Sequence, residues 1–174
     1  MAWITKNSAT EKISRRSEPY LTEAMKDRLE AKVLVRYPTR QAATLPVLHA
    51  VQHEVGWLPA QALEEVADFL ELDAAVVLDT ATFYEEFWLE PKGKYVFWVC
   101  QSISCELMGE STITQCLKDK LGIEPGETTE DGRFTLMKVE CLGSCGTAPC
   151  ALVNEVLHEN LTTDNIDQII AELD

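Results

Sequence analysis

Long apolar runs, a secretory leader and a basic cluster are all missing from this sequence. No tract in its 174 residues approaches the roughly 20 consecutive apolar residues of a membrane-spanning helix, which argues against direct membrane insertion. Residues 1–20 are polar and contain no apolar stretch ahead of a cleavage site, so we expect a cytoplasmic protein. The formal net charge is -14, and basic residues gather only over residues 12–16. This balance argues against a nucleic-acid partner and favours a protein partner.

Three motifs of enzymatic chemistry are also missing. No G-x-G-x-x-G follows a predicted strand and no phosphate-binding loop is present, so we do not expect this chain itself to bind nicotinamide or flavin. The C-x-x-C motif of thiol–disulfide oxidoreductases is missing as well. The chain does contain six cysteines. Because a reducing cytosol disfavours structural disulfides, these cysteines indicate metal-binding or catalytic thiols.

The first half of the chain has the apolar spacing of helices. Residues 1–20 lack this periodicity and are expected to form a flexible tail. Beyond them, the spacing of apolar residues, with Gly56 as a stop signal and Pro59 as a start signal, predicts four helices, at residues 21–37, 41–55, 59–70 and 73–80. The sequence therefore predicts a helical domain over residues 21–90.

The periodicity changes after Pro91. Residues 95–99 (YVFWV) form a short β-branched and aromatic run that is typical of a strand. The elements predicted after it are a helix at 110–121, strands at 134–139 and 150–154, and a last helix capped by Thr162. The fold class predicted is α+β, in which an N-terminal helical bundle precedes an α/β domain over residues 91–174.

Four cysteines form two close pairs. Cys100 and Cys105 are separated by four residues, Cys141 and Cys145 by three, and each pair is predicted to lie in a loop after a strand. Four thiolates complete either a tetrahedral zinc site or a 2Fe-2S cluster. Structural zinc sites commonly have two residues between ligands, so the wider spacing favours the cluster and leaves zinc as the alternative. Gly143 and Gly146 are predicted either to bring backbone N–H groups close to the sulfurs or only to form a turn.

Several motifs of the chain are similar to those of one known family. They are residues 99–109 (VCQSISCELMG), 126–134 (GETTEDGRF), 140–149 (ECLGSCGTAP), 56–59 (GWLP) and 81–84 (ATFY). Together they resemble the thioredoxin-like 2Fe-2S subunit, the E-type subunit, of NADH:quinone oxidoreductase, or respiratory complex I. The resemblance runs from about Leu29 to the C-terminus, and the chain departs from it at Cys150, where an aliphatic residue is commoner.

The resemblance implies a thioredoxin-like ferredoxin domain with one 2Fe-2S cluster on Cys100, Cys105, Cys141 and Cys145. It implies a one-electron carrier next to a flavoprotein subunit that holds FMN and oxidises NADH, together with other complex I subunits. The chain would then be part of an NADH dehydrogenase enzyme, peripheral to the inner membrane through that complex, while the isolated chain would not oxidise NADH. An NAD-linked formate dehydrogenase or a hydrogenase remains an alternative parent enzyme, and a structural zinc module with four cysteine ligands an alternative function.

Other candidate residues have less specific patterns. Cys116 and Cys150 are predicted to be core filler, with a ligand role for Cys150 as the alternative, because four thiolates already suffice. His49 and His53 have helical spacing but lack the H-E-x-x-H pattern, so we expect them on a helix surface. Phe83 and Tyr84 are predicted either to contact the flavoprotein or to fill the core.

Overall fold

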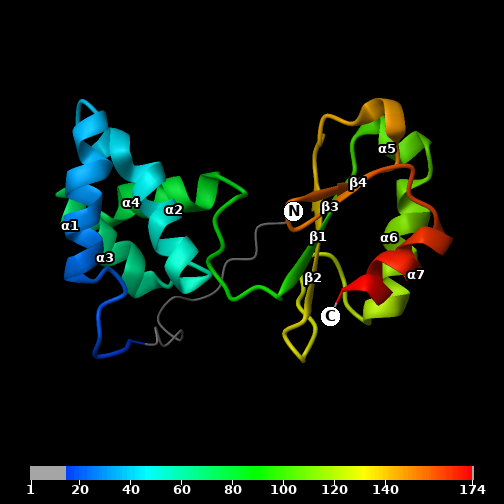
Figure 1. The fold of residues 1–174 in the computed structure, drawn as a ribbon, viewed down its shortest axis with the longest axis horizontal. Helices are drawn as coiled ribbons and strands as arrows, with labels where there is room; N and C mark the ends of the chain where they lie inside the picture. Colours follow the sequence, from blue (N-terminus) through cyan, green and yellow to red (C-terminus); the bar gives the residue numbers. More distant parts are fainter. Residues whose placement is uncertain (1–14, 174) are drawn as a thin grey trace. The chain divides into compact units, whose positions relative to one another are not determined.

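The protein is described by a computed structural model that covers residues 15–173 (Figure 1). The chain divides into two compact units, Met1–Pro91 and Lys92–Asp174. Within the described residues, no helix combines the length and the apolarity that crossing a membrane requires. The first unit is helical and the second contains a sheet, in agreement with the predicted α+β class.

From residue 15 on, where the structure describes it, the first unit contains four α-helices and two short 3-10 turns. These elements are α1 (Glu23–Lys32), η2 (Leu34–Arg36), η3 (Gln41–Ala43), α2 (Thr44–Val55), α3 (Ala60–Leu70) and α4 (Ala74–Phe83). Their apolar faces share one core, with Leu29, Leu48, Val66 and Val77 among its buried side chains. A helix is present at each of the four predicted places. The first, predicted over residues 21–37, ends earlier, as α1 (Glu23–Lys32) followed by the 3-10 turn η2, and the last ends three residues later than predicted.

Two local signals end and begin helices in this unit. Gly56 follows α2 with a φ of 89°, a left-handed conformation that glycine adopts without a steric cost. Pro59 stands immediately before α3, at its N-cap.

Residues 1–14 of the predicted tail lie outside the described part of the chain. Within residues 15–20, Arg15 forms an ion pair with Glu64 at 2.6 Å, and the Arg16 N–H donates to Gln61 of α3.

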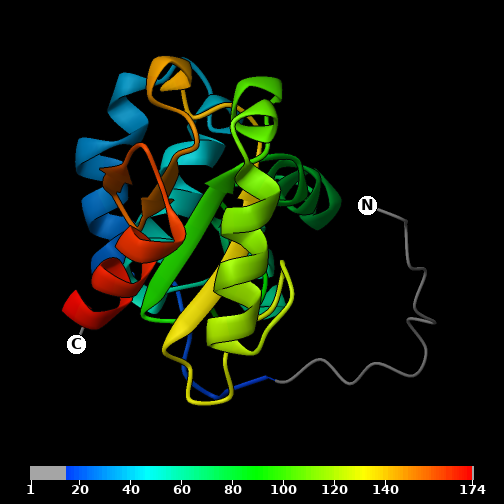
Figure 2. The ribbon, with the colours of Figure 1, turned by 90° about the vertical axis from the view of Figure 1, so that its right-hand side faces the viewer.

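The second unit is a four-stranded sheet with helices packed on it. Its elements are β1 (Tyr95–Cys100), α5 (Ile103–Leu107), α6 (Glu110–Leu121), β2 (Phe134–Val139), η4 (Cys145–Thr147), β3 (Ala151–Val153), β4 (Val156–His158) and α7 (Thr163–Glu172). The strand order is β2-β1-β3-β4. Both α6 and α7 lie on the same side of the sheet and bury Leu117 and Ile166 against Phe97 and Leu136 (Figures 1 and 2).

The predicted element order of this unit is incomplete. Helix α6 and strand β2 have the predicted bounds, and Thr162 caps α7 as expected, with its side chain accepting from the Asn165 N–H. The prediction omitted α5 and β4, and it made β3 one residue too long at each end. Strand β4 is only three residues long, two of them exposed, so it carries little of the burial pattern from which strands are predicted.

The strand directions bring three chain segments to one edge of the sheet. Strand β1 is parallel to β2, with Cys100 opposite Val139, so both strands end at this edge. Strand β3 is antiparallel to β1 and therefore begins there. A backbone hydrogen bond of 3.1 Å from the Cys100 N–H to the Cys150 carbonyl continues this pairing. In Figure 2, α5 lies beyond the end of β1.

The shared core of the second unit predicts the effect of a leucine truncation. Leu117 of α6 is fully buried, so Leu117→Ala should lower the free energy of unfolding by about 2–5 kcal/mol through lost burial and a residual cavity. The matched control is Leu157→Ala in β4, where the side chain is 41% exposed, and it should change stability by about 0.5 kcal/mol or less. Denaturant unfolding followed by circular dichroism checks both, and equal losses would contradict this core.

Candidate metal centre

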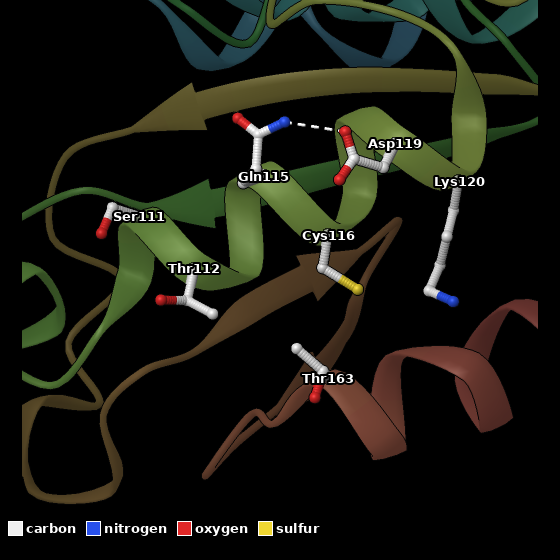
Figure 3. Close-up of a pocket in the computed structure, with 7 residues that line it drawn as sticks. All are labelled: Ser111, Thr112, Gln115, Cys116, Asp119, Lys120 and Thr163. Carbon is white, nitrogen blue, oxygen red and sulfur yellow. Dashed lines mark hydrogen bonds between the residues drawn. The ribbon is translucent and has the colours of Figure 1, made fainter.

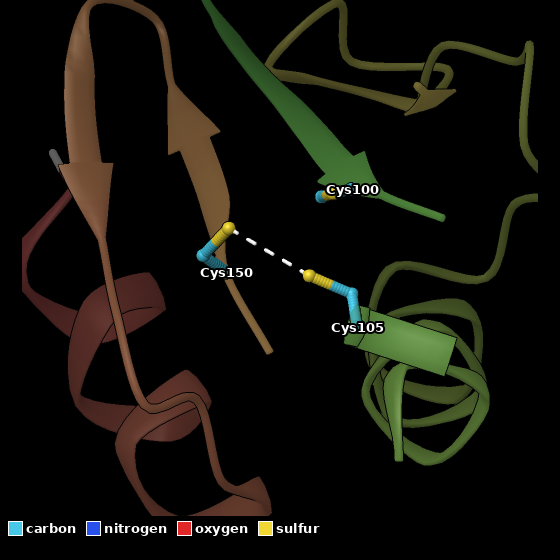
Figure 4. A group of neighbouring side chains, drawn as sticks. All are labelled: Cys100, Cys105 and Cys150. Atoms are coloured by element: carbon cyan, nitrogen blue, oxygen red, sulfur yellow. Dashed lines mark hydrogen bonds between the residues drawn. The ribbon is translucent and has the colours of Figure 1, made fainter. Parts of the chain in front are cut away.

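Three buried thiols lie together at this edge of the sheet. Cys100 is the last residue of β1, Cys105 lies within α5, and Cys150 immediately precedes β3. Their Sγ atoms lie within 4.8 Å of one another, and Cys105 and Cys150 are 3.8 Å apart (Figure 4). Each of the three residues is only 1% exposed. Within the described residues, this is the group whose atoms are close enough to share one metal ion.

The short helix α5 directs Cys105 into this group. It begins after Ser102, whose carbonyl accepts from the Glu106 N–H at 2.9 Å. Ile103 and Leu107 of this helix are exposed, whereas Cys105 is buried. The prediction that Cys100 and Cys105 lie in a loop is therefore wrong in detail, because one ends a strand and the other lies in a helix too short to show helical periodicity.

The second pair, Cys141 and Cys145, is exposed. The two Sγ atoms are 3.4 Å apart. Gly143 has a φ of 82° and its N–H donates to Cys141 Sγ at 3.3 Å. The left-handed turn thus directs a backbone donor at the sulfur, so the two predicted roles of Gly143 coincide. Gly146 lies in η4, in the turn that carries Cys145.

Hydrogen bonds connect the two cysteine pairs. Burial raises the pKa of the Cys100 thiol, but N–H groups of Leu142 and Ser102 and the neighbouring thiols bring it below its ordinary value. Leu142 follows Cys141, so the second loop donates to a thiol of the first pair. Hydrogen bonding with Cys141 raises the pKa of Cys145, and a hydrogen bond from Ser104 opposes this shift. The structure thus brings all four predicted ligands to one edge of the sheet.

The remaining thiols of the buried group stay protonated at neutral pH. Burial raises the pKa of Cys105, and it raises the pKa of Cys150 to about 12, with hydrogen bonding to Cys105 as a further cause. A metal ion reverses this preference, since a coordinating thiol is deprotonated outright. Metal binding at this site therefore releases protons.

The donor set fits an iron–sulfur cluster. Thiolates are the ligands of such clusters, and two of them serve each iron of a 2Fe-2S centre. Two thiolates on one tetrahedral ion lie about 3.8 Å apart, given metal–sulfur bonds of about 2.3 Å. The Sγ–Sγ distances of 3.4 Å between Cys141 and Cys145 and of 3.8 Å between Cys105 and Cys150 have this magnitude. Cys141 and Cys145 supply the donors that the buried group lacks.

Hydrogen bonds to Glu159 stabilise the loop that carries Cys145. Its carboxylate accepts hydrogen bonds from the hydroxyls of Ser144 and Thr147, on either side of Cys145 and Gly146. These two hydrogen bonds hold the pKa of Glu159 below its ordinary value. A further backbone bond from the Asn160 N–H to the Thr147 carbonyl, at 2.8 Å, holds the same loop.

The other candidate residues lie elsewhere. Cys116 is half-buried on α6 and its sulfur points toward α7, at a surface cavity of about 550 Å³ that Lys120 and Thr163 also line (Figure 3). It packs against the core of the second unit, in line with its predicted role as filler. His49 and His53 are both exposed on α2, as expected for helix-surface residues.

The comparisons with known proteins identify the family. Residues 31–174 match the thioredoxin-like 2Fe-2S ferredoxin family, and the chain belongs to that family. The predicted thioredoxin-like fold is therefore confirmed, and the family and the thiol group together support an iron–sulfur cluster on this chain.

Relatives of the chain are subunits of oxidoreductases. The chain is 42% identical to an E-type NADH-quinone oxidoreductase subunit of Rhizobium meliloti, over 84% of this chain and 86% of that one. It is 40% identical to NADH-quinone oxidoreductase subunit 2 of Thermus thermophilus, over 82% of this chain and 80% of the relative. These relatives confirm the predicted resemblance to the E-type subunit of this enzyme.

A solved structure with a similar fold is that of an NAD+-reducing NiFe hydrogenase in its air-oxidised state. It superimposes with a TM-score of 0.64 at 28% identity, over 72% of this chain. The chain spans only 22% of the length of the matched hydrogenase chain. The likeness therefore concerns a module within a longer protein.

The sequence favoured packing for Cys150 and kept a ligand role only as the alternative, whereas the structure places its Sγ beside those of Cys100 and Cys105. The signal available was its position at the start of a predicted strand. The pairing of β3 with β1 brings Cys150 next to Cys100, because Ala151 is opposite Val99. Strand pairing is not encoded in the spacing of the cysteines, so this contact required the tertiary structure.

The lowered pKa of Glu159 predicts a pH dependence. A carboxylate with a lowered folded-state pKa stabilises fully above its unfolded pKa, and the stabilisation is lost as pH falls through the folded-state value. Glu159→Gln should therefore unfold at a lower temperature at neutral pH and lose less further stability on acidification than the unmodified chain. Thermal unfolding of the purified chain on both sides of pH 4.5, the ordinary pKa of glutamate, checks this.

The control for this experiment is Glu155→Gln, which removes the same charge from the β3–β4 turn without contacting Ser144 or Thr147. It should keep the pH dependence of the unmodified chain. If both variants reduce the loss of thermal stability on acidification equally, the effect comes from net charge and not from the hydrogen bonds that Glu159 accepts.

Proposed function

We propose that this chain is a one-electron transfer subunit of NADH:quinone oxidoreductase, with one 2Fe-2S cluster on Cys100, Cys105, Cys141 and Cys145. The observation that carries the proposal is that parallel strands β1 and β2 end at one sheet edge, where Leu142 of the second cysteine loop donates to Cys100, in a chain that is 42% identical to an E-type subunit of that enzyme. The cluster, when bound, supplies the capacity to accept and release one electron.

The chain's own residues hold and tune this site. The N–H groups of Leu142, Ser102 and Gly143 donate to ligand sulfurs. Hydrogen bonds to the sulfurs stabilise the more negative, reduced state and raise the reduction potential. Cys100 and Cys105 are shielded from water, whereas Cys141 and Cys145 are exposed. Electrons therefore enter and leave on the side of the exposed pair.

The surface next to the exposed pair supports a protein partner. Helix α5 presents Ile103 and Leu107 to solvent, with Leu107 80% exposed, and the exposed Met108 follows them. Ser104 of the same helix contacts Cys145. Exposed apolar side chains beside a functional group are typical of interaction sites. The partner proposed is the flavoprotein subunit that holds FMN and NADH. The complex would be cytoplasmic and peripheral to the inner membrane.

Phe83 and Tyr84 offer a second contact for this partner. Phe83 is 77% exposed, so its alternative role as a core residue is wrong. Its ring packs edge-on against that of Tyr84, with ring centroids 5.0 Å apart, which gives the end of α4 an exposed aromatic surface. Aromatic residues are enriched at interface cores, which supports a docking role.

The fold likeness to the NAD+-reducing hydrogenase supports a second parent enzyme. In that case the chain would carry electrons within a hydrogenase or an NAD-linked formate dehydrogenase, through the same site. Copurification of neighbouring subunits distinguishes these parent enzymes.

Metal analysis tests the proposed site. The chain purified without oxygen should contain two irons and two acid-labile sulfides, and it should give a spin-half EPR signal after reduction with dithionite. One zinc ion without visible colour would replace the electron-transfer function by a structural zinc module. The isolated chain should not oxidise NADH, and turnover at enzyme-like rates would contradict its role as a carrier.

The exposed aromatic surface of Phe83 and Tyr84 predicts that a substitution there weakens binding of the flavoprotein. Phe83→Ser should weaken association with the copurifying flavoprotein about tenfold or more, since exposed aromatic anchors contribute strongly to binding. Thermal stability should change little because the side chain is already exposed. The control is Val35→Ser, an exposed apolar residue of η2, which should leave the affinity unchanged. Equal affinities for the unmodified chain and Phe83→Ser would rule out this contact.

A further inference from the structure

The buried thiol group contains one sulfur more than the proposed ligand set requires at this position. Cys100 and Cys105 are the proposed ligands of the first iron, and Cys150 lies within 4.8 Å of both (Figure 4). Four thiolates complete a 2Fe-2S centre, so one of the five clustered thiols is free of iron in the intact site.

The distance between the sulfurs of Cys150 and Cys105 is the one expected for two ligands of the same metal ion. Its Sγ lies 3.8 Å from Cys105 Sγ, which is the separation of about 3.8 Å that two thiolates have on one tetrahedral metal ion. The exposed pair, Cys141 and Cys145, is separated by 3.4 Å. Cys105 and Cys150 thus have the spacing of two thiolates on one iron.

The sheet holds Cys150 in this position. Its carbonyl accepts from the Cys100 N–H at 3.1 Å, and the next residue, Ala151, pairs with Val99. The residue is 1% exposed, so water does not compete for a metal at this side. Cys105, in contrast, lies in a helix of five residues at the edge of the fold. The extra thiol is therefore positioned by backbone pairing with β1, independently of the helix that carries Cys105.

We propose that Cys150 is a reserve ligand, which binds the first iron in place of Cys105 when the Cys105 thiolate is missing. This inference rests on the proposed function. In that case an iron–sulfur bond to Cys150 forms where residue 105 supplies no thiolate, the S–H bond of Cys150 breaks, and its proton passes to solvent. No electron is transferred, so the exchange requires no oxidant or reductant.

The test compares Cys105→Ser with the double variant Cys105→Ser, Cys150→Ser. Serine is close in size to cysteine, so the variants preserve the packing around residue 105. Each chain is purified without oxygen, and its iron, acid-labile sulfide, visible spectrum and EPR signal after dithionite are measured. The single variant should retain two irons, two sulfides and the all-thiolate spectrum of the unmodified chain. The double variant should lose the cluster or show a shifted spectrum through ligation by serine oxygen.

The matched control adds Cys116→Ser to the Cys105→Ser chain, because Cys116 is a thiol of the same unit outside the buried group. This control should resemble the Cys105→Ser chain. Cys150→Ser alone should keep its cluster, since four ligands remain. The same comparison is made between Cys100→Ser and the double variant Cys100→Ser, Cys150→Ser, because Cys150 Sγ lies within 4.8 Å of Cys100 Sγ as well.

Identical spectra and iron contents in the single and double variants would overturn the reserve role, whether both chains lose the cluster or both keep it. In the Cys105→Ser chain, a loss of cluster on adding Cys116→Ser as large as that on adding Cys150→Ser would overturn it too. Failure of the proposed function is distinguishable, because the unmodified chain would then contain no iron and no sulfide.

Discussion

The pairing of β1 with two neighbours of opposite direction is the constraint on which the site depends. Strand β2 is parallel to β1 and ends at the same edge, whereas β3 is antiparallel and begins there. Cys100, the loop after β2 and Cys150 are thereby brought together, although they are far apart in the sequence. The core beneath α6 and α7 holds the sheet, so the geometry of the thiols depends on packing remote from them.

The site combines two environments in one group of sulfurs. On one side, Cys100, Cys105 and Cys150 are buried, and burial raises the pKa of the last two. On the other, the second pair is exposed in a loop held by backbone donors and by Glu159. A buried side protects a metal centre from water, and an exposed side allows electron exchange with a partner. The arrangement is consistent with a carrier that exchanges electrons through its surface.

The division of the chain separates the redox site from a proposed docking element. All six cysteines lie in the second unit, yet the family match begins at residue 31 and so includes much of the helical unit. The helices of that unit bury their apolar faces in a core of their own, but Phe83 and Tyr84 are exposed at the end of α4. The helical unit therefore offers a second exposed surface beside that of α5, whereas the cysteines all belong to the α/β unit.

The sequence alone determined the helical and α/β halves, the bounds of α6 and β2, the cap of α7 and the two cysteine pairs, since each depends on local periodicity or spacing. Helix α5 and strand β4 escaped prediction because five and three residues are too short for a periodic signal. Only the tertiary structure decided that Phe83 is exposed and that Cys150 lies 3.8 Å from Cys105. The two sulfurs belong to residues 45 positions apart, and their contact follows from strand pairing, which local patterns do not specify.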